Sequence, residues 1–264
     1  MQISSDKKIY FISDFHLGAP DYASSREREK IIVQFLDEIK NKAAEIFLVG
    51  DMFDFWYEYR KVVPKGYVRL LGKLAELSDA GIPIHFFAGN HDMWMKDYFL
   101  KELNIPVYFE PKEFERNGKK FLIGHGDGLG PGDQGYKRLK KFFRNPACKW
   151  LFGVLPPIFG MGLANYLSRR SRAQTGATEE IFLGEEKEWL IIYCKEILKE
   201  KNYNFFVFGH RHLAIDFRLN PDSDRDSRYI NLGDWIHYYT YAVFDGEKLD
   251  LKSYLGKDEK IIRK

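Results

Sequence analysis

The stretch "FVFGHRHLAI" (residues 206–215) places two histidines one residue apart, directly after a strongly apolar run. An apolar run that turns polar in this way is typical of a buried strand that ends in a loop. Alternate residues beyond a strand end can point to the same side, so we expect His210 and His212 to converge on one point. This stretch therefore predicts both a buried strand and a polar site at its carboxyl end.

The same pattern recurs along the chain and predicts an α/β fold. Apolar runs that end in polar residues occur in "KKIYFISDFHLG" (7–18), "AEIFLVGD" (44–51), "IPIHFFAGNHD" (82–92) and "KKFLIGHGDG" (119–128). Helical spacing separates them at 26–43, 67–79 and 185–201, and short strands are expected at 228–234, 240–246 and 248–254. Sheets of this class gather their sites at the carboxyl ends of the strands.

The amino-acid composition limits the class of protein to which this chain can belong. The 264 residues are 45% hydrophobic and 30% charged, so the chain can bury a substantial core. Its two cysteines, Cys148 and Cys194, are too few for a disulfide framework and fit a reducing compartment. No signal-peptide core precedes Ile9, and no uncharged apolar stretch reaches the roughly 20 residues that span a bilayer. We therefore expect a cytoplasmic protein.

Five polar clusters follow the predicted strands. They are Asp14-Phe-His16, Gly50-Asp51, Gly89-Asn90-His91-Asp92, Gly124-His125-Gly126-Asp127 and Gly209-His210-Arg-His212. Imidazole, carboxylate and amide oxygen are ligands for divalent transition metals, and glycine lets the backbone turn tightly beside them. Each cluster alone reads as a turn, a cap or a surface pair, but their joint occurrence favours one metal site. His85 and His237 lack this context and are expected to be structural.

The order of these clusters resembles the signature of the calcineurin-like metallophosphoesterases, over about residues 9–250. The resemblance implies a four-layer α/β/β/α sandwich with an inserted helical lid and a dinuclear centre, in a single domain over 1–264. Carried over to this sequence, one metal is held by Asp14, His16, Asp51 and His212. The other is held by Asp51, Asn90, His125 and His210, so that Asp51 bridges the two.

The implied chemistry is hydrolysis of a phosphoric ester or anhydride. Two neighbouring cations activate water and neutralise phosphoryl oxygens. His91 is the expected proton donor to a phosphoryl oxygen or the leaving group, and Asp92 is expected to orient His91 or a neighbouring loop. Asp127 is either a support for His125 or a turn residue. The donor set admits manganese, iron or zinc, and the resemblance implies two manganese ions.

Residues 136–172 form a basic, aromatic insertion that we call the lid. Residues 137–172 contain nine Lys or Arg and no Asp or Glu, although the rest of the chain is slightly acidic. Cations alternate there with apolar side chains: Phe142, Phe143, Trp150, Leu151, Phe152, Leu155, Ile158, Phe159 and Met161. This pattern indicates a segment that lies on an anionic membrane or holds the acyl chains of a lipid. The alternative is that the aromatics pack on the body; nucleic-acid binding is not expected.

The lid narrows the resemblance to the branch that hydrolyses the pyrophosphate of UDP-2,3-diacylglucosamine in lipid A biosynthesis. This implies a lipid-linked nucleotide substrate, UMP and 2,3-diacylglucosamine 1-phosphate (lipid X) as products, and peripheral association with the inner membrane through the lid. Substrate contacts are then expected at Asn90, His91, Asp133, Tyr136, Ser171, Arg172, His210 and His212.

The chain departs from the best-studied members of that branch. His91 stands where they have arginine, and Thr175 and Thr178 stand roughly where they have asparagine and lysine, with Arg169, Arg170 or Arg172 as nearby replacement cations. Three alternatives stay open: a metallophosphoesterase acting on another nucleotide diphosphate or phosphodiester, a nuclease, and a scaffold without metals. Complete ligand positions argue against the last. The sequence does not determine the oligomeric state.

Overall fold

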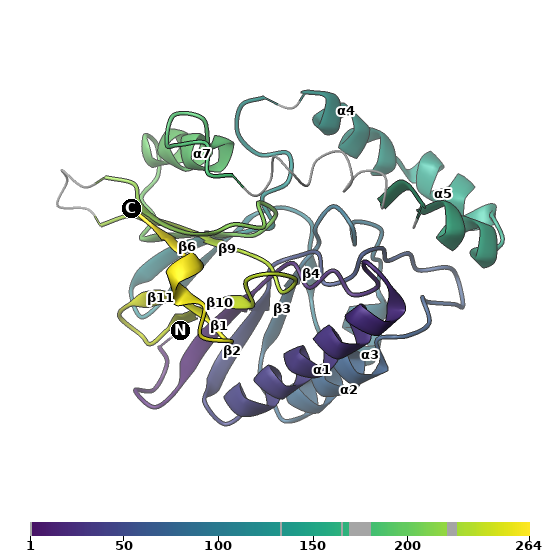
Figure 1. Cartoon of the computed structure of the whole chain (residues 1–264), viewed down its shortest axis with the longest axis horizontal. Coiled ribbons are helices and arrows are strands. Elements are labelled where there is room, and N and C mark those ends of the chain that lie inside the picture. Colours follow the sequence, from purple (N-terminus) through teal and green to yellow (C-terminus); the bar gives the residue numbers. More distant parts are fainter. Residues whose placement is uncertain (1, 133, 165, 169–180, 221–225) are drawn as a thin grey trace.

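The computed structural model describes residues 2–132, 134–164, 166–168, 181–220 and 226–264. Two six-stranded mixed sheets pack face to face, with helices on both outer faces (Figure 1). The predicted four-layer α/β/β/α sandwich is confirmed. The two sheets run in the order β11-β10-β1-β2-β3-β4 and β12-β8-β9-β7-β6-β5.

The first sheet is built around parallel strands from the first half of the chain. It comprises β1 (Lys8–Ile12), β2 (Ala43–Leu48), β3 (Ile84–Phe87), β4 (Val107–Tyr108), β10 (Thr240–Phe244) and β11 (Leu249–Ser253). Strands β1 to β4 are parallel, whereas β10 joins β1 antiparallel. The carboxyl ends of the four parallel strands therefore meet at one edge of the sheet.

The second sheet repeats this arrangement with later strands. It comprises β5 (Lys112–Arg116), β6 (Lys119–Ile123), β7 (Phe205–Phe208), β8 (Ala214–Arg218), β9 (Arg228–Leu232) and β12 (Ile262–Arg263). Strands β6, β7 and β9 are parallel. Strands β4, β5, β8 and β12 were not predicted, because they are short or carry charges that interrupt the apolar runs.

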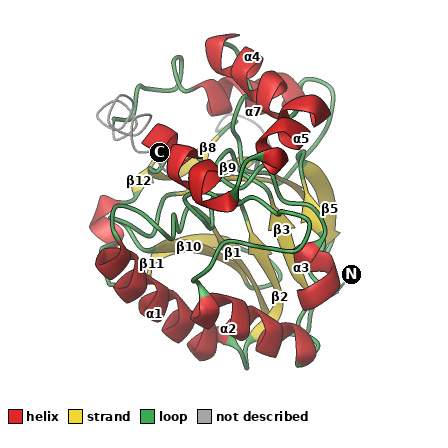
Figure 2. Ribbon diagram, turned by 90° about the vertical axis from the view of Figure 1, so that its right-hand side faces the viewer, coloured by secondary structure: helices red, strands yellow, loops and turns green. Residues whose placement is uncertain are grey.

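Helices cover the two outer faces. The helices α1 (Tyr22–Ile39), α2 (Val68–Asp79) and α3 (Tyr98–Leu103) lie on the first sheet, and α7 (Trp189–Leu198) covers the second (Figures 1 and 2). Helix α1 begins four residues before the predicted 26–43, because Asp21 caps it by accepting a hydrogen bond from the Ser24 amide (3.0 Å). A short 3₁₀ turn, Asp258–Lys260, precedes β12.

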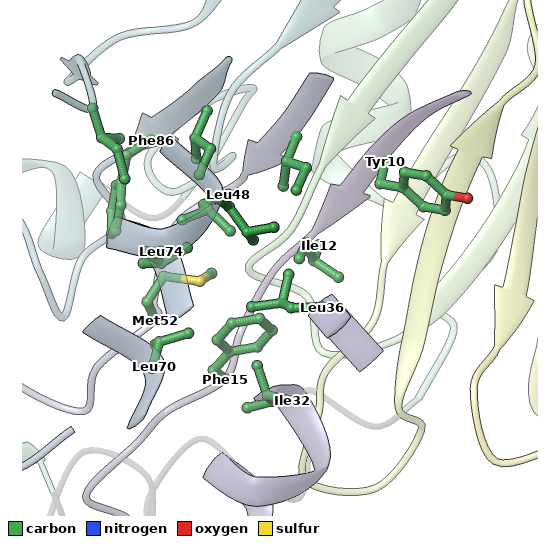
Figure 3. Packing of buried hydrophobic residues seen from close by; sticks show 14 of the residues in the cluster. Tyr10, Ile12, Phe15, Ile32, Leu36, Leu48, Met52, Leu70, Leu74 and Phe86 are labelled. Carbon is green, nitrogen blue, oxygen red and sulfur yellow. The ribbon is translucent and has the colours of Figure 1, made fainter. Parts of the chain in front are cut away.

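Each central strand buries both of its faces. In β1, Tyr10 and Ile12 point to the helices and pack with residues such as Leu36 and Leu74 (Figure 3). Ile9 and Phe11 point the other way, into the core between the sheets, where the Phe11 and Phe121 rings lie 5.9 Å apart. Two buried faces explain why these strands read as continuous apolar runs in the sequence.

A buried ion pair also joins the two sheets. Glu45 of β2 is 1% exposed and accepts hydrogen bonds from Arg116 of β5 at 2.7 and 2.6 Å. His85 of β3 lies 2.8 Å from the same carboxylate. Burial opposes the charge, but Arg116 and His85 outweigh it and lower the pKa of Glu45. His85 therefore belongs to the sandwich, away from the polar clusters.

The lid segment lies between β6 and β7. Helices α4 (Gln134–Phe143) and α5 (Pro146–Val154) are followed by helical residues 157–164 and 166–168. Packing of its aromatics on the body is confirmed for some of them, and the membrane interpretation stays a prediction. Phe143 and Phe152 pack against Tyr57 and Trp94 of the body, as the alternative reading predicted. Other apolar side chains of the lid are exposed: Leu139, Phe142, Trp150, Leu151, Val154, Leu155, Ile158, Phe159, Leu163, Tyr166 and Leu167.

Close contacts hold the lid onto the body. The Tyr57 hydroxyl donates to the Lys149 carbonyl (2.7 Å), and the Trp94 indole donates to the Phe143 carbonyl (2.8 Å). A Cβ added at Gly153 would lie 2.5 Å from the Tyr57 hydroxyl oxygen, so only glycine permits this approach. Among the described helices, none combines the length and apolarity needed to cross a bilayer.

We predict that Glu45→Ala lowers the free energy of unfolding by about 3 kcal/mol at pH 7, because it leaves Arg116 without its buried partner. Urea denaturation measures this loss. The pKa of Glu45 is lowered in the folded state, so the contribution is present above pH about 4.3 and disappears as the pH falls further. The exposed pair of Glu113 with Lys201 gives a control: Glu113→Ala should cost about 0.5 kcal/mol or less. Equal losses in both variants would contradict the cross-sheet role.

Candidate metal centre

The loops after β1, β2, β3, β6 and β7 bring the predicted ligands together. Three groups of side chains have ligand atoms that lie within 4.8 Å of one another: Asp14, His16 and His212; His16, Asp51 and His91; and Asp51, His125 and His210. The first group contains three of the four ligands predicted for one metal, and the third group contains three of the four predicted for the other. The two parallel strand sets end at the same edge of the sandwich, so residues almost 200 positions apart become neighbours.

The first cluster combines β1 and β7 loops. His16 Nε2 lies 3.0 Å from His212 Nε2 and 3.5 Å from Asp14 Oδ1, and His212 Nε2 lies 3.3 Å from the same oxygen. The other carboxylate oxygen, Asp14 Oδ2, accepts hydrogen bonds from Ser13 Oγ and the His210 amide. Asp14 therefore has one oxygen fixed by the protein and one aimed at the two imidazoles.

The second cluster is centred on Asp51. Its Oδ2 lies 3.2 Å from His125 Nε2 and 3.9 Å from His16 Nε2, so the carboxylate stands between the two clusters. Its Oδ1 accepts a hydrogen bond from the His91 amide at 2.9 Å. His210 completes the group, with its ring centroid 5.2 Å from that of His125. This is the arrangement that a shared, bridging carboxylate requires.

Supporting hydrogen bonds fix which atoms face the site. His125 Nδ1 donates to the Val49 carbonyl at 2.8 Å, which leaves Nε2 unprotonated when the ring is neutral. Within the described ranges, Asp14 Oδ1, Asn90 Oδ1 and His125 Nε2 are buried without a hydrogen-bond partner. Buried polar atoms without partners are costly, and bound cations would satisfy all three. The donor set of imidazole, carboxylate and amide oxygen therefore fits divalent metals.

Backbone strain is concentrated at the same residues. Asp14, His16, Asp51, His210 and His212 all have φ between 44° and 69°, in the left-handed region that side-chain-bearing residues seldom adopt. The surrounding structure has to hold each of them there, which is typical of functional sites.

One glycine illustrates how crowded the centre is. Gly50 has φ 89°, and a Cβ added to it would lie 2.4 Å from His125 Nδ1. A side chain at this position would displace a ligand ring, so the Gly-Asp pair is required by geometry and not only by turn chemistry.

The charges of the centre are coupled. Burial opposes ionisation of Asp51, but His125, His91 and His16 outweigh burial and hold the pKa of Asp51 well below its usual value. Burial also disfavours a charged His125, yet Asp51 raises the pKa of that ring well above the usual value. The chain alone therefore favours an ionised Asp51 beside a protonated His125, and a bound cation would compete with that proton for His125.

His91 and Asp92 lie beside the ligands in different roles. The His91 ring stands edge-on to His16, with centroids 4.8 Å apart, and its Nδ1 donates to the Asp54 carbonyl at 2.8 Å. The Asp92 carboxylate accepts hydrogen bonds from the Met52 amide (3.0 Å) and the Gly89 amide (2.5 Å). Of the two expected roles of Asp92, orientation of a neighbouring loop is the one that its contacts fit, since it joins the loops that carry Asp51 and Asn90.

Two residues not singled out by the sequence, Asp54 and Ser168, connect the centre to the lid. The Asp54 carboxylate lies 3.7 Å from His91 Nδ1 and 3.9 Å from His16 Nδ1, and it accepts a hydrogen bond from Ser168 of the lid (3.1 Å). Asp54 lies three residues after Asp51, and this spacing was the available signal. Ser168 gave no signal because it lies in a helix with no motif.

Asp127 anchors the first lid helix. Its carboxylate accepts a hydrogen bond from Tyr136 (2.7 Å) and pairs with Lys140 (2.7 Å), and its carbonyl accepts a second hydrogen bond from Lys140 (2.8 Å). Tyr136 also lies near the centre, with its ring 6.3 Å from that of His210. Of the other expected substrate contacts, Asp133, Ser171 and Arg172 lie outside the described residues, as do Arg169, Arg170, Thr175 and Thr178.

Comparison with known proteins agrees with this geometry. A family model described as calcineurin-like phosphoesterase matches residues 7–214, which include every predicted ligand. The chain belongs to the calcineurin-like phosphoesterase family. It is 41% identical over 258 residues to the UDP-2,3-diacylglucosamine hydrolase of Porphyromonas gingivalis, covering 93% of this chain and 97% of that protein.

More distant relatives carry the same name. The UDP-2,3-diacylglucosamine hydrolase of Ectopseudomonas mendocina is 29% identical over 241 residues, covering 90% of this chain and 95% of that protein. That of Pseudomonas aeruginosa is 29% identical over 232 residues, covering 86% of this chain and 90% of that protein. The similarity therefore extends through the lid and the strands after it.

We predict that Asp51→Ala removes both metals, because one carboxylate stands between the two clusters. For protein purified in manganese, the metal content should fall from about two ions per chain to near zero. Inductively coupled plasma mass spectrometry measures this content. Asp250→Ala, at an exposed position on β11, is the matched control and should keep its metal. Retention of both ions in the Asp51 variant would exclude a bridging carboxylate.

Proposed function

We propose that this protein hydrolyses the pyrophosphate bond of UDP-2,3-diacylglucosamine, releasing UMP and 2,3-diacylglucosamine 1-phosphate, a step of lipid A biosynthesis. The observation that carries the proposal is the pair of ligand clusters that share Asp51. It is joined by the 41% identity to a hydrolase named for this substrate, over nearly the whole of both chains. The sandwich and the lid form one catalytic domain in this proposal.

The proposed cofactors are two divalent cations, with manganese as the native metal. Asp14, His16, Asp51 and His212 would hold one, and Asp51, Asn90, His125 and His210 the other. Paired cations supply an activated water and neutralise phosphoryl oxygens during in-line attack on phosphorus. The chain contributes the fixed imidazole tautomers, the shared carboxylate and the buried setting that keep both ions close.

His91 is the proposed proton donor. Its hydrogen bond to the Asp54 carbonyl holds the Nδ1 proton, which leaves Nε2 for exchange with substrate oxygen. A ring nitrogen of His91 lies within 4.8 Å of ligand atoms of His16 and Asp51, so the imidazole stands beside the phosphoryl position. Asp92 acts indirectly in this scheme, by holding the loops that carry Asp51 and Asn90.

The lid and the body enclose a cavity suited to the acyl chains. Its volume is about 1020 Å³, and its wall combines Gly18, Tyr67 and Val63 of the body with Pro157, Ile158 and Met161 of the lid. Gly18 in this wall lies two residues after His16, and a Cβ added to it would lie 3.5 Å from Asp54 Cβ, so one part of the wall belongs to a loop of the metal centre. The nucleotide and sugar phosphates would then contact Asn90, His91, Tyr136, His210 and His212, and we propose Asp133, Ser171 and Arg172 for the same set.

The exposed lid surface supports association with a membrane. Trp150 is 70% exposed, Ile158 79% and Phe159 69%, and basic residues of the lid accompany them. Aromatic and aliphatic side chains of this kind insert at the acyl boundary while cations meet lipid phosphates. We propose that the protein acts in the cytoplasm, bound peripherally to the inner membrane, where a diacylated substrate resides. Nucleic acid is not a proposed partner.

The test of this function is product analysis by mass spectrometry. With UDP-2,3-diacylglucosamine in detergent micelles and added manganese, we expect UMP and 2,3-diacylglucosamine 1-phosphate, and no products after metal removal. In ¹⁸O-labelled water the label should enter UMP, which reports attack at the phosphorus attached to uridine. Hydrolysis of a different nucleotide diphosphate in preference to the diacylated one would assign the centre to another substrate, which the His91 departure makes the main alternative.

We predict that His91→Ala lowers turnover by about 10²–10⁴-fold while metal content stays near that of the parent, because His91 is a proton donor and not a predicted ligand. Steady-state kinetics and metal analysis of the same preparation measure both quantities. Lys252→Ala, at an exposed position on β11 (side chain 47% exposed), is the control and should change neither quantity. Loss of one metal equivalent from the His91 variant would make His91 a ligand instead.

A further inference from the structure

A second, smaller cavity lies between the lid and the body, and three cations are part of its lining. Its volume is about 480 Å³, and it lies between the loop around Tyr57, Arg60 and Lys96 of the body and helix α5 of the lid. Lys149, Trp150 and Val154 supply the wall on the α5 side. The residues that line this cavity differ from those of the acyl-chain cavity except for Tyr59.

Among the residues that the structure describes, the cations of this cavity have no acidic partner. No acidic residue of that set lines the cavity, and none of its carboxylate oxygens lies within 4.0 Å of the charged nitrogens of Arg60, Lys96 or Lys149. Lys96 Nζ instead donates to the Glu58 carbonyl (2.7 Å) and lies 5.1 Å from the centre of the Tyr57 ring. Burial, together with Arg144 and Lys96, lowers the pKa of Lys149. Like charges gathered without a counter-charge favour an anion between them.

The apolar surroundings indicate which kind of anion fits. Trp150 and Val154 line the cavity and are also 70% and 62% exposed, so the cavity opens onto the exposed apolar face of the lid. Leu151 and Phe159 extend that face. In a bilayer, phosphates lie just outside the acyl boundary at which tryptophan is enriched. A lid with its apolar face in that boundary would hold Arg60, Lys96 and Lys149 at the level of the phosphates.

We propose that the cavity formed by Tyr57, Arg60, Lys96, Lys149, Trp150 and Val154 binds the headgroup phosphate of an anionic phospholipid of the membrane. The proposal rests on the proposed membrane association but concerns a site separate from the metal centre. A bound headgroup would bridge the body, through Arg60 and Lys96, to α5 of the lid, through Lys149. It would thereby fix the orientation in which the acyl-chain cavity meets the bilayer.

The experiment is vesicle sedimentation with the full-length, metal-loaded protein. Vesicles of phosphatidylcholine alone are compared with vesicles that also contain about one third phosphatidylglycerol. The double variant Arg60→Gln/Lys96→Gln should bind the anionic vesicles about 30-fold more weakly than the parent, the loss expected for two cations at a charged surface. Binding to phosphatidylcholine vesicles should change by less than about twofold, because no net headgroup charge is involved.

The control variant removes the same charge elsewhere. Lys199 and Lys252 are exposed, at the end of α7 and on β11, away from the lid. Lys199→Gln/Lys252→Gln should lose less than about threefold in binding to the anionic vesicles. Equal losses in the two double variants, or no loss in the cavity variant, would overturn the headgroup site. Unchanged vesicle binding with lost binding to a single-stranded oligonucleotide would assign the cavity to nucleic acid instead.

Hydrolysis measured in detergent micelles separates this proposal from the proposed function. The cavity variant should retain the turnover of the parent there, because no bilayer has to be bound and neither residue lies in the metal centre. Failure of the parent to hydrolyse UDP-2,3-diacylglucosamine would contradict the proposed function. The vesicle experiment would still test the headgroup site, because it does not depend on hydrolysis. A cavity variant that is inactive in micelles and binds vesicles normally would contradict the headgroup site.

Discussion

The buried carboxylate of Asp51 is the contact on which the rest of the site depends. It is 1% exposed, and one of its oxygens faces His16 from the first sheet and His125 from the second. The two sheets must therefore meet with their parallel strands ending at the same edge, or the two clusters would not share a residue. The apolar core between the sheets and the cross-sheet pair of Glu45 with Arg116 supply this alignment. The ligand loops contain residues with left-handed backbone and buried polar atoms without hydrogen-bond partners. Both features cost free energy, and the loops keep this conformation because the scaffold holds them in place.

Much of this arrangement follows from the sequence. The central strands were predicted because both of their faces are buried, which makes them continuous apolar runs. A metal site was predicted because strands of this kind end in residue types that can bind metals, and the family resemblance then assigned the individual ligands. Strands β4, β5, β8 and β12 were missed, since two-residue strands and strands interrupted by charged side chains leave no such run. The contacts of Asp54, Asp127 and Ser168 were also beyond the sequence, because they join segments that only the folded lid brings together.

The lid shows how one segment serves two requirements. Its amphipathic sequence was compatible with packing on the body and with binding a membrane. In the structure, Phe143 and Phe152 pack against Tyr57 and Trp94, whereas Trp150, Ile158 and Phe159 are exposed. Hydrogen bonds from Tyr136 and Lys140 to Asp127, and from Ser168 to Asp54, tie the same segment to loops of the metal centre. The proposed lipid binding by the lid and the proposed chemistry at the metal centre would thus be connected through direct contacts.

The central claim is that two neighbouring cations share Asp51. A crystal of the protein grown with manganese, with data collected at the manganese absorption edge, tests it most directly. The account predicts two anomalous peaks, one beside Asp14, His16 and His212 and the other beside Asn90, His125 and His210, with Asp51 between them and contacting both. A single peak, or two peaks of which Asp51 contacts only one, would contradict the account.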